Sequence, residues 1–479
     1  MSDRPPILDV SGGSHGITVA TEHALALADA YAEAGDRMRG WAADDGAVLL
    51  DGDLLESALL SPVTFAEAEA AVLAATGGPD GVVVASVAWE ADALTIRVAV
   101  RATQLTDELV AGAMDRLDHD LGYVVGYTFT ATLPETALPM LAGGGILYLV
   151  WSQLPDGTRA ELEGRTLDEV QEWLDQHPEV VQHVVNGSGG LLEGLWDGLV
   201  PFAHLGVSDT DDAAALLAGL YSDGHAHTAL TTLTVPGPQQ PPADLAGLLQ
   251  HLSAVNDLSS TDHPENNGTI EVQTITGPDG SVRHVVYLPG TDDLTTTPWS
   301  QDADVRDLGT NALLVSGRDN AYQQGILDAM RQAGIKPGEP VALVGHSQGG
   351  MEAAAILAHG SPYDVTNVVT AGSPTAYLDG FPPGAHVLSL ENQGDVIPLL
   401  DGADNRDSAE QVTVRFDDHE TSIGANHGLD HYVAGAGAVQ SSGDPSIRDQ
   451  LTSLEEGGFI GAGAGQEVTS QVFQITRVP

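Results

Sequence analysis

The chain has 479 residues, no cysteine, and 68 acidic residues against 17 basic ones, a formal net charge of −51. This composition excludes disulfides, thiolate metal ligands and a cysteine nucleophile, and it disfavours binding to nucleic acid or to anionic membranes. The hydrophobic fraction of 42% is typical of a globular protein, and the length predicts two or three domains.

Residues 1–255 are predicted to form a mainly α-helical region, with a break between two subdomains near 125–165. The segment 81–121 is ambiguous between strand and helix, and we favour helix. The longest apolar stretch, 137–151, is interrupted by Pro139 and three glycines, so no transmembrane segment is expected. The other expected helices of this region are 19–41, 65–76, 166–174, 179–185, 209–220 and 245–255.

The polar stretch 256–268 predicts a linker, and the pattern changes after it. Strands alternate with helices from residue 269 to residue 479, which favours an α/β fold with a doubly wound, mostly parallel sheet. Helices are expected at 320–333 and from about residue 428. The expected strands are 269–276, 281–288, 341–344, 367–371, 386–390, 411–416 and a late edge strand at 472–477.

The most informative segment is Gly345-His346-Ser347-Gln348-Gly349. It follows the apolar run 341–344 and precedes a small-residue helix at 351–359. This order of strand, glycine-flanked serine and helix is that of a nucleophile elbow, in which the serine hydroxyl is exposed above the sheet. The alternative is a glycine-rich turn without chemistry. We therefore interpret Ser347 as a candidate nucleophile.

A serine nucleophile needs a base that is oriented by an acid. Asp395 follows the predicted strand 386–390, and His427 lies in the loop that enters the last predicted helix. His427 and His431 are four residues apart, which would suit a metal pair, but no third ligand is obvious, so neither a metal nor a cofactor is expected. The weaker candidates for the acid are Glu391, Asp401 and Asp404. Among the other histidines, His386 precedes the acid and is set aside, His419 is expected to be a solvated loop residue, and His431 is expected to be a packing or polar neighbour.

Four segments together resemble α/β-hydrolases related to class 3 lipases. They are Pro289-Gly290-Thr291, the serine pentapeptide, Thr370-Ala371-Gly372-Ser373-Pro374, and Gly394-Asp395-Val396-Ile397-Pro398 followed by His427-x-x-x-x-Tyr432. The resemblance implies an α/β-hydrolase fold with the triad Ser347, Asp395 and His427. It also implies an oxyanion hole formed by the backbone N–H groups of Thr291 and Gln348.

Two further residues are predicted to contact substrate: His346, beside the serine, and Trp299, in the loop 291–311. A surface position for Trp299 is the alternative. The N-terminal helices loosely resemble the WXG100-like modules fused to some actinobacterial hydrolases, although the one WxG sequence, Trp196-Asp197-Gly198, lies late in the region.

The combined prediction is a serine carboxylic-ester hydrolase of the esterase or lipase type, which forms an acyl-enzyme on Ser347. Its substrate is expected to be a small-molecule or lipid ester. An acyltransferase with the same triad, and an interaction or secreted effector protein that uses the hydrolase fold as a scaffold, are the alternatives. A protein partner is an option for the helical region. No classical signal peptide is recognised, which leaves a cytoplasmic location or export by a type VII-like route open.

Overall fold

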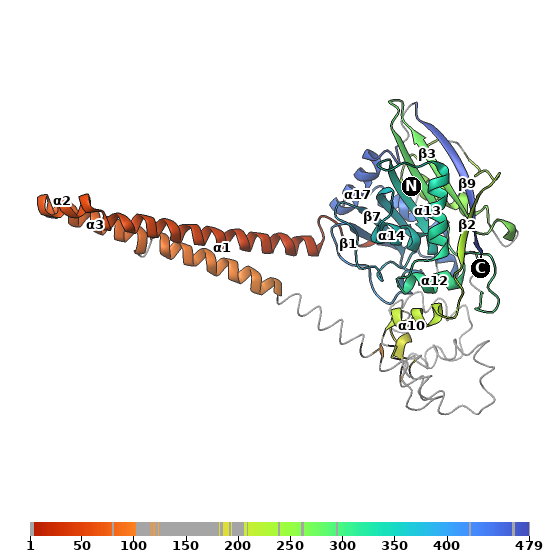
Figure 1. The fold of residues 1–479 in the computed structure, drawn as a ribbon, viewed down its shortest axis with the longest axis horizontal. Coiled ribbons are helices and arrows are strands. Elements are labelled where there is room, and N and C mark those ends of the chain that lie inside the picture. Colours follow the sequence, from red (N-terminus) through yellow and green to blue (C-terminus); the bar gives the residue numbers. More distant parts are fainter. Residues whose placement is uncertain are drawn as a thin grey trace. The chain divides into compact units, whose positions relative to one another are not determined.

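The computed structural model describes residues 4–78, 81–101, 206–207, 209–237, 240–259, 263–293, 296–420, 423–461 and 465–478, with short pieces between 116 and 193. It is a mixed α/β protein (Figure 1). The chain divides into two compact units, which are described separately below. The sheet unit comprises Met1–Gly16 and Met114–Pro479, and the helical unit comprises Ile17–Ala113.

The sheet unit is built on one nine-stranded sheet with the order β1-β8-β7-β6-β5-β4-β3-β9-β2. Its central strands are parallel and follow one another in chain order: β4 (Val282–Leu288), β5 (Pro340–His346), β6 (Asp364–Ala371), β7 (His386–Asn392) and β8 (Gln411–Phe416). Antiparallel strands extend it on both sides: β1 (Ile7–Gly12), β3 (Thr269–Thr276), β9 (Glu467–Val478) and β2 (His225–Leu230).

Helices cover both faces of the sheet, because the central strands are apolar on both faces. In β5, Val341 and Leu343 point into one core cluster, and Ala342 and Val344 into the other, as the two-residue period of a strand requires. The helices of the first face are α13 (Ala321–Ala333) and α14 (Gln348–His359). Those of the second face are α11 (Leu245–Asn256), α16 (Leu429–Val439) and α17 (Pro445–Glu456).

Shorter elements complete this unit. Two of these shorter helices, α10 and α12, begin at aspartates, Asp209 and Asp307, whose side chains accept a hydrogen bond from a first-turn N–H. The shorter elements are α10 (Thr210–Ala218), α12 (Leu308–Val315), α15 (Ile423–Asn426), η3 (Pro264–Asn266) and η4 (Ile397–Leu399).

The predicted strands between residues 269 and 416 are all confirmed, with bounds that differ by no more than about three residues, and the helix at 320–333 is confirmed as α13. The late strand predicted at 472–477 is confirmed as part of β9, but its predicted edge position is wrong, because β9 lies between β3 and β2. Strand β2 adds outside it, and neither β2 nor β1 was expected.

The division of the chain also differs from the predicted boundary at 256–268. Strands β1 and β2 and helix α11 all precede that boundary, yet they belong to the sheet unit. Leu248 and Leu249 of α11 are fully buried in the same core cluster as Val344 of β5. A polar stretch marks an ordinary turn as well as a linker, and here it joins a core helix to a core strand.

The helical unit is helical through most of its described part, 17–78 and 81–101. Its elements are α1 (Ile17–Ala47), η1 (Val48–Leu50), α2 (Gly52–Leu60), α3 (Pro62–Gly77) and a helix over residues 82–101. The last of these packs against α1, where Arg97 pairs with Asp29 at 2.6 Å and the Tyr31 and Trp89 rings lie 5.0 Å apart. The helix that we favoured for 81–121 is thus confirmed over its described part.

By length and composition alone, the stretch Pro62–Arg101 could cross a membrane, which is weak evidence by itself. Helix α3 ends within this stretch, where Gly78 takes an extended conformation. Some of the sequence predictions fall wholly or almost wholly outside the described residues. They are the helices at 166–174 and 179–185, the break near 125–165, the stretch 137–151 and the WxG sequence.

Candidate active site

Ser347 occupies the turn between the end of β5 and the start of α14. Its φ of 52° and ψ of −125° place a non-glycine residue in a region that L-amino acids rarely adopt. The turn is fixed on both sides: the N–H of Ser347 donates to the carbonyl of Ala371 at 2.9 Å, and its carbonyl accepts from Gly350 at 3.0 Å. The sequence prediction of a sharp strand-to-helix turn at this serine is confirmed.

The flanking glycines explain why this turn needs its sequence. A Cβ on Gly345 would lie 2.3 Å from the backbone of Gly349, and one on Gly349 would lie 2.0 Å from the carbonyl oxygen of Leu288. Backbone atoms cannot move away as a flexible side chain can. Glycine is therefore required at both positions for α14 to approach the sheet so closely.

Asp395 and His427 are joined directly. Asp395 follows β7, His427 precedes α16, and His427 Nδ1 lies 2.7 Å from Asp395 Oδ2. The carboxyl group is only 3% exposed, and its Oδ1 accepts from the N–H of Ile397 at 2.9 Å. A carboxylate that accepts from Nδ1–H leaves the Nε2 lone pair of His427 free to accept a proton.

Tyr432, on α16, completes the surroundings of Asp395. Its hydroxyl donates to Asp395 Oδ2 at 2.6 Å, which is the oxygen that His427 also uses. Complete burial raises the pKa of Tyr432 well above its usual value, and the nearby Asp395 charge adds to the rise. The phenol therefore stays protonated and remains a donor. Sequence analysis had placed this tyrosine in the lipase-like pattern without giving it a role.

His346 contacts the histidine loop. Its Nε2–H donates to the backbone carbonyl of His427 at 2.8 Å, and the two rings lie 4.5 Å apart. Burial lowers the pKa of His346 well below its usual value, and the neighbouring His427 lowers it further, so the ring is neutral. Because His346 directly precedes Ser347, this contact holds the His427 loop beside the serine turn. A contact of His346 with substrate stays a prediction.

The hydrogen bonds of the described residues do not include one from Ser347 Oγ to His427. In serine hydrolases this bond is often long before substrate binds and shortens as the reaction begins. His427 is placed near Ser347 by the hydrogen bond from His346 to its backbone carbonyl, because His346 directly precedes the serine turn.

Residues of the predicted oxyanion hole lie against the serine. A Cβ on Gly290 would be 3.0 Å from the Cβ of Ser347, so the Pro289-Gly290-Thr291 segment passes directly over it. Arg306, which is fully buried, donates to the carbonyl of Gly290 at 3.0 Å. Because the C=O and N–H of a trans peptide point in opposite directions, this bond turns the N–H of Thr291 away from Arg306.

One residue that sequence analysis missed, Asn311 of α12, holds both donor residues. Its amide donates to Thr291 Oγ1 at 3.1 Å, and its Oδ1 accepts from Gln348 Nε2 at 2.8 Å. The Gln348 side chain is thereby directed toward α12. Its backbone N–H lies at the first position of α14, where a helix supplies no acceptor for it. No local pattern in the sequence distinguishes Asn311.

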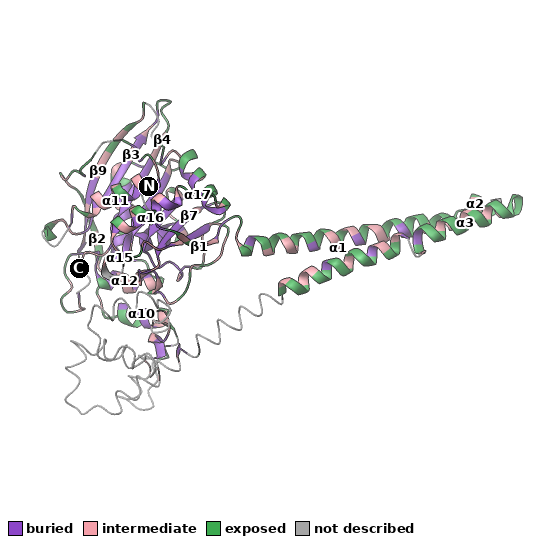
Figure 2. Ribbon diagram, turned by 180° about the vertical axis from the view of Figure 1, so that it is seen from behind, coloured by how far each residue is buried: buried purple, intermediate pink, exposed green. Residues whose placement is uncertain are grey.

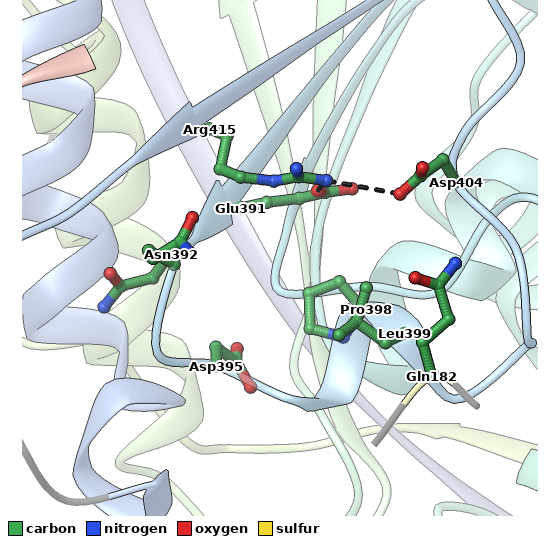
Figure 3. A pocket seen from close by; sticks show the side chains of 9 residues that line it. Gln182, Glu391, Asn392, Asp395, Pro398, Leu399, Asp404 and Arg415 are labelled. Carbon is green, nitrogen blue, oxygen red and sulfur yellow. Dashed lines mark hydrogen bonds and ion pairs between the residues drawn. The ribbon is translucent and has the colours of Figure 1, made fainter. Parts of the chain in front are cut away.

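A polar cavity of about 260 Å³ adjoins Asp395 (Figure 3). Glu391 in its wall is paired with Arg415 at 3.3 Å, and Asp404 lies at 3.3 Å from the same guanidinium. Burial raises the pKa of Glu391 to about 6. The cavity is lined by Gln182, Glu391, Asn392, Gln393, Asp395, Pro398, Leu399, Asp404 and Arg415.

The rival candidates have other partners. Glu391 and Asp404 bind Arg415, and Asp401 accepts from the N–H of Ala376 at 2.6 Å. His431 Nδ1 bonds to Asp418 rather than to Asp395. His419 is a surface residue with a 74% exposed side chain.

Trp299 is 83% exposed, which matches the surface alternative more closely than the substrate-contacting one. In the part of the chain that the structure describes, no group of three or more His, Cys, Asp or Glu side chains is arranged to hold a metal ion.

Comparison with known proteins adds no relative: no family model, curated protein or solved structure matches the chain.

Proposed function

We propose that the sheet unit is an α/β-hydrolase and that it cleaves carboxylic esters through an acyl-enzyme on Ser347. The conformation of Ser347 carries the proposal. A serine held at positive φ between a strand and a helix costs free energy, on the order of 1–3 kcal/mol, and such strain persists mainly where function requires it. The bonded pair Asp395 and His427 supplies the base that the serine needs.

The reaction follows from these groups. His427 Nε2 accepts the hydroxyl proton as Ser347 Oγ attacks the ester carbonyl carbon. The tetrahedral intermediate collapses, His427 returns the proton to the departing alkoxide, and an alcohol leaves. Water then attacks the acyl-serine in the same way, which releases the carboxylic acid and restores the serine.

Three fixed groups lower the barrier. The backbone N–H groups of Thr291 and Gln348 would donate to the oxygen that becomes negative in the intermediate, and each such donor is worth about 3 kcal/mol. Asp395 holds His427 in the tautomer with Nδ1 protonated and stabilises the imidazolium that forms.

The net charge of −51 bears on the substrate. Such a field repels anionic head groups and anionic esters, so neutral or zwitterionic esters are the expected class. A series of neutral esters of increasing acyl length would define the preference. Transfer of the acyl group to an added alcohol, detected as a new ester, would assign the protein to the acyltransferases instead.

A fluorophosphonate probe tests the nucleophile. Its phosphorus forms a bond to an activated serine oxygen as fluoride leaves, and we expect labelling of the wild type and none of Ser347→Ala. The matched control, Ser361→Ala, removes a loop serine that bonds to Tyr363 and should be labelled like the wild type. An unlabelled wild type that is folded and that turns over no ester would contradict the proposal.

A further inference from the structure

The helical unit packs small residues inside. Apart from Val19 near its start, the buried residues of α1 are small and recur at intervals of seven, as do those of the helix over 82–101. We call them the small-residue seam: Ala28, Gly35 and Ala42 on α1, and Ser86 and Ala93 on the other helix. The backbones approach closely here, since a Cβ on Gly35 would lie 3.1 Å from the carbonyl oxygen of Ser86. A helical hairpin in water normally fills such a seam with leucine, isoleucine or valine.

Many large apolar residues of this unit are exposed. They are most exposed where α1 is followed by α2 and α3, and we call this group the apolar tip: Leu50 at 80%, Leu59 at 89%, Leu60 at 88% and Val63 at 69% exposed. Figure 2 shows α2 and α3 as mainly exposed helices. Between residues 54 and 66 the one charged side chain is Glu56. In water these leucine side chains remain in contact with solvent.

The composition of helix α3 indicates which surroundings would shield the exposed leucines from water. This helix is apolar, and its apolar residues are distributed around all its sides. Of its sixteen residues, Thr76 alone is buried, and Leu73 is 53% exposed. A protein groove would cover one side of such a helix, whereas lipid contacts all sides of the part that enters it. The two charged residues of α3, Glu67 and Glu69, follow Val63 by more than one helical turn and lie on the part that stays in water.

We propose that the apolar tip inserts into the interface of an electrically neutral lipid bilayer, to a depth of about 5–10 Å. The acidic side chains of α1 limit the depth: Asp29, Glu33 and Asp36 are each more than 70% exposed and stay in water. A net charge of −51 makes zwitterionic head groups acceptable and anionic ones repulsive. This activity belongs to the helical unit and does not depend on the proposed hydrolysis.

The experiment is flotation of the full-length protein with phosphatidylcholine vesicles. We expect the wild type to float with the vesicles. The variant Leu59→Gln/Leu60→Gln should partition at least roughly tenfold more weakly, because two exposed leucines lose their transfer into lipid. The matched control, Leu220→Gln/Leu230→Gln, changes leucines that are 63% and 57% exposed in the sheet unit and should float like the wild type. Phosphatidylserine added to the vesicles should weaken binding at low salt, and added salt should restore it.

Each other outcome overturns the proposal. Absence of the wild type from the vesicle fraction, or equal loss in both double variants, would show that the tip does not mediate binding. Concentration-dependent dimerisation that the Leu59/Leu60 variant abolishes, without vesicle binding, would assign a second copy of the chain as the cover. Hydrolysis of a water-soluble ester, measured in parallel, should be the same in all three proteins, so a failure here is distinct from a failure of the proposed function.

Discussion

The two units of this protein treat apolar side chains in opposite ways. In the sheet unit, Leu249 and Leu343 are fully buried between helices and strands of the same chain. In the helical unit, Leu59 and Leu60 are almost fully exposed, and most of the buried residues are alanine, glycine or serine. The sheet unit therefore supplies the cover for its own hydrophobic surface, and the helical unit does not. The presence of large apolar side chains does not by itself distinguish the two units. They differ in which residues lie inside, and in the helical unit these are mostly small.

The substitution with the largest expected effect tests whether polar groups buried in the sheet unit take part in catalysis. His427→Ala should lower kcat/KM for a neutral ester by about 10⁴ or more, since the serine loses its base. His431→Ala is the matched control, because that ring bonds to Asp418, and it should retain nearly full activity. Steady-state kinetics on both variants gives the comparison. If His431→Ala were the inactive one, the base would have to be reassigned.

The elbow and the strands were readable from the sequence because they depend on local patterns. A run of apolar residues, a glycine-flanked serine and a small-residue helix determine β5, the turn and α14 with little help from elsewhere. The acid and base were identified by their positions after strands and before a helix. The structure joins Asp395 to His427 by the hydrogen bond that this interpretation requires.

What the sequence did not predict depends on partners far away in the chain. Strand β1 forms by pairing with β8, in which Val10 lies opposite Val414. Strand β2 (His225–Leu230) has few apolar residues and forms by pairing with β9. Asn311 and Arg306 acquire their contacts with the Thr291 segment only once α12 has packed. No local periodicity reports such contacts.

The next largest effect concerns a carboxyl group that is buried in the sheet unit, where most other buried polar groups are hydrogen-bonded. Burial raises the pKa of Glu352, on α14, to about 8. Neither carboxyl oxygen has a hydrogen-bond partner among the described residues. Between pH 4.5 and 8 the folded protein thus holds a proton that the unfolded chain releases, so the free energy of unfolding falls as the pH rises, by up to about 5 kcal/mol.

Glu352→Gln removes this titration and should flatten that part of the profile, as measured by urea unfolding at a series of pH values. Glu391 and Asp401, whose pKa values burial raises to about 6 and about 7, contribute slopes of the same sign that both proteins share. The exposed Glu456→Gln is the control and should leave the profile unchanged. Parallel profiles for the wild type and Glu352→Gln would mean that Glu352 is ionised in the folded state.

A pair of identical substitutions measures the difference between the two units directly. Leu249→Ala should destabilise the sheet unit by about 2–5 kcal/mol, because it opens a cavity in the core. Leu59→Ala should change the free energy of unfolding by less than about 0.5 kcal/mol, because that side chain is already in water. Urea unfolding of both variants without lipid is the measurement. A large loss at Leu59 would place the apolar tip inside the fold and remove the contrast.

The smallest expected effect separates support of the catalytic pair from support of the fold. Tyr432→Phe deletes the hydroxyl that donates to Asp395 Oδ2 and leaves the ring packed on Phe416. Without that donor, the Asp395 carboxylate accepts hydrogen bonds from the Ile397 N–H and from His427 alone. Its orientation toward the imidazole ring is then less firmly fixed. We expect kcat to fall about tenfold with little change in KM, since the oriented imidazole matters most in the transition state. Tyr363→Phe removes a hydroxyl that bonds to the Leu327 carbonyl and serves as the matched control. If both variants lost the same stability and neither lost kcat, Tyr432 would be a packing residue, and the catalytic pair would be oriented by its other hydrogen bonds.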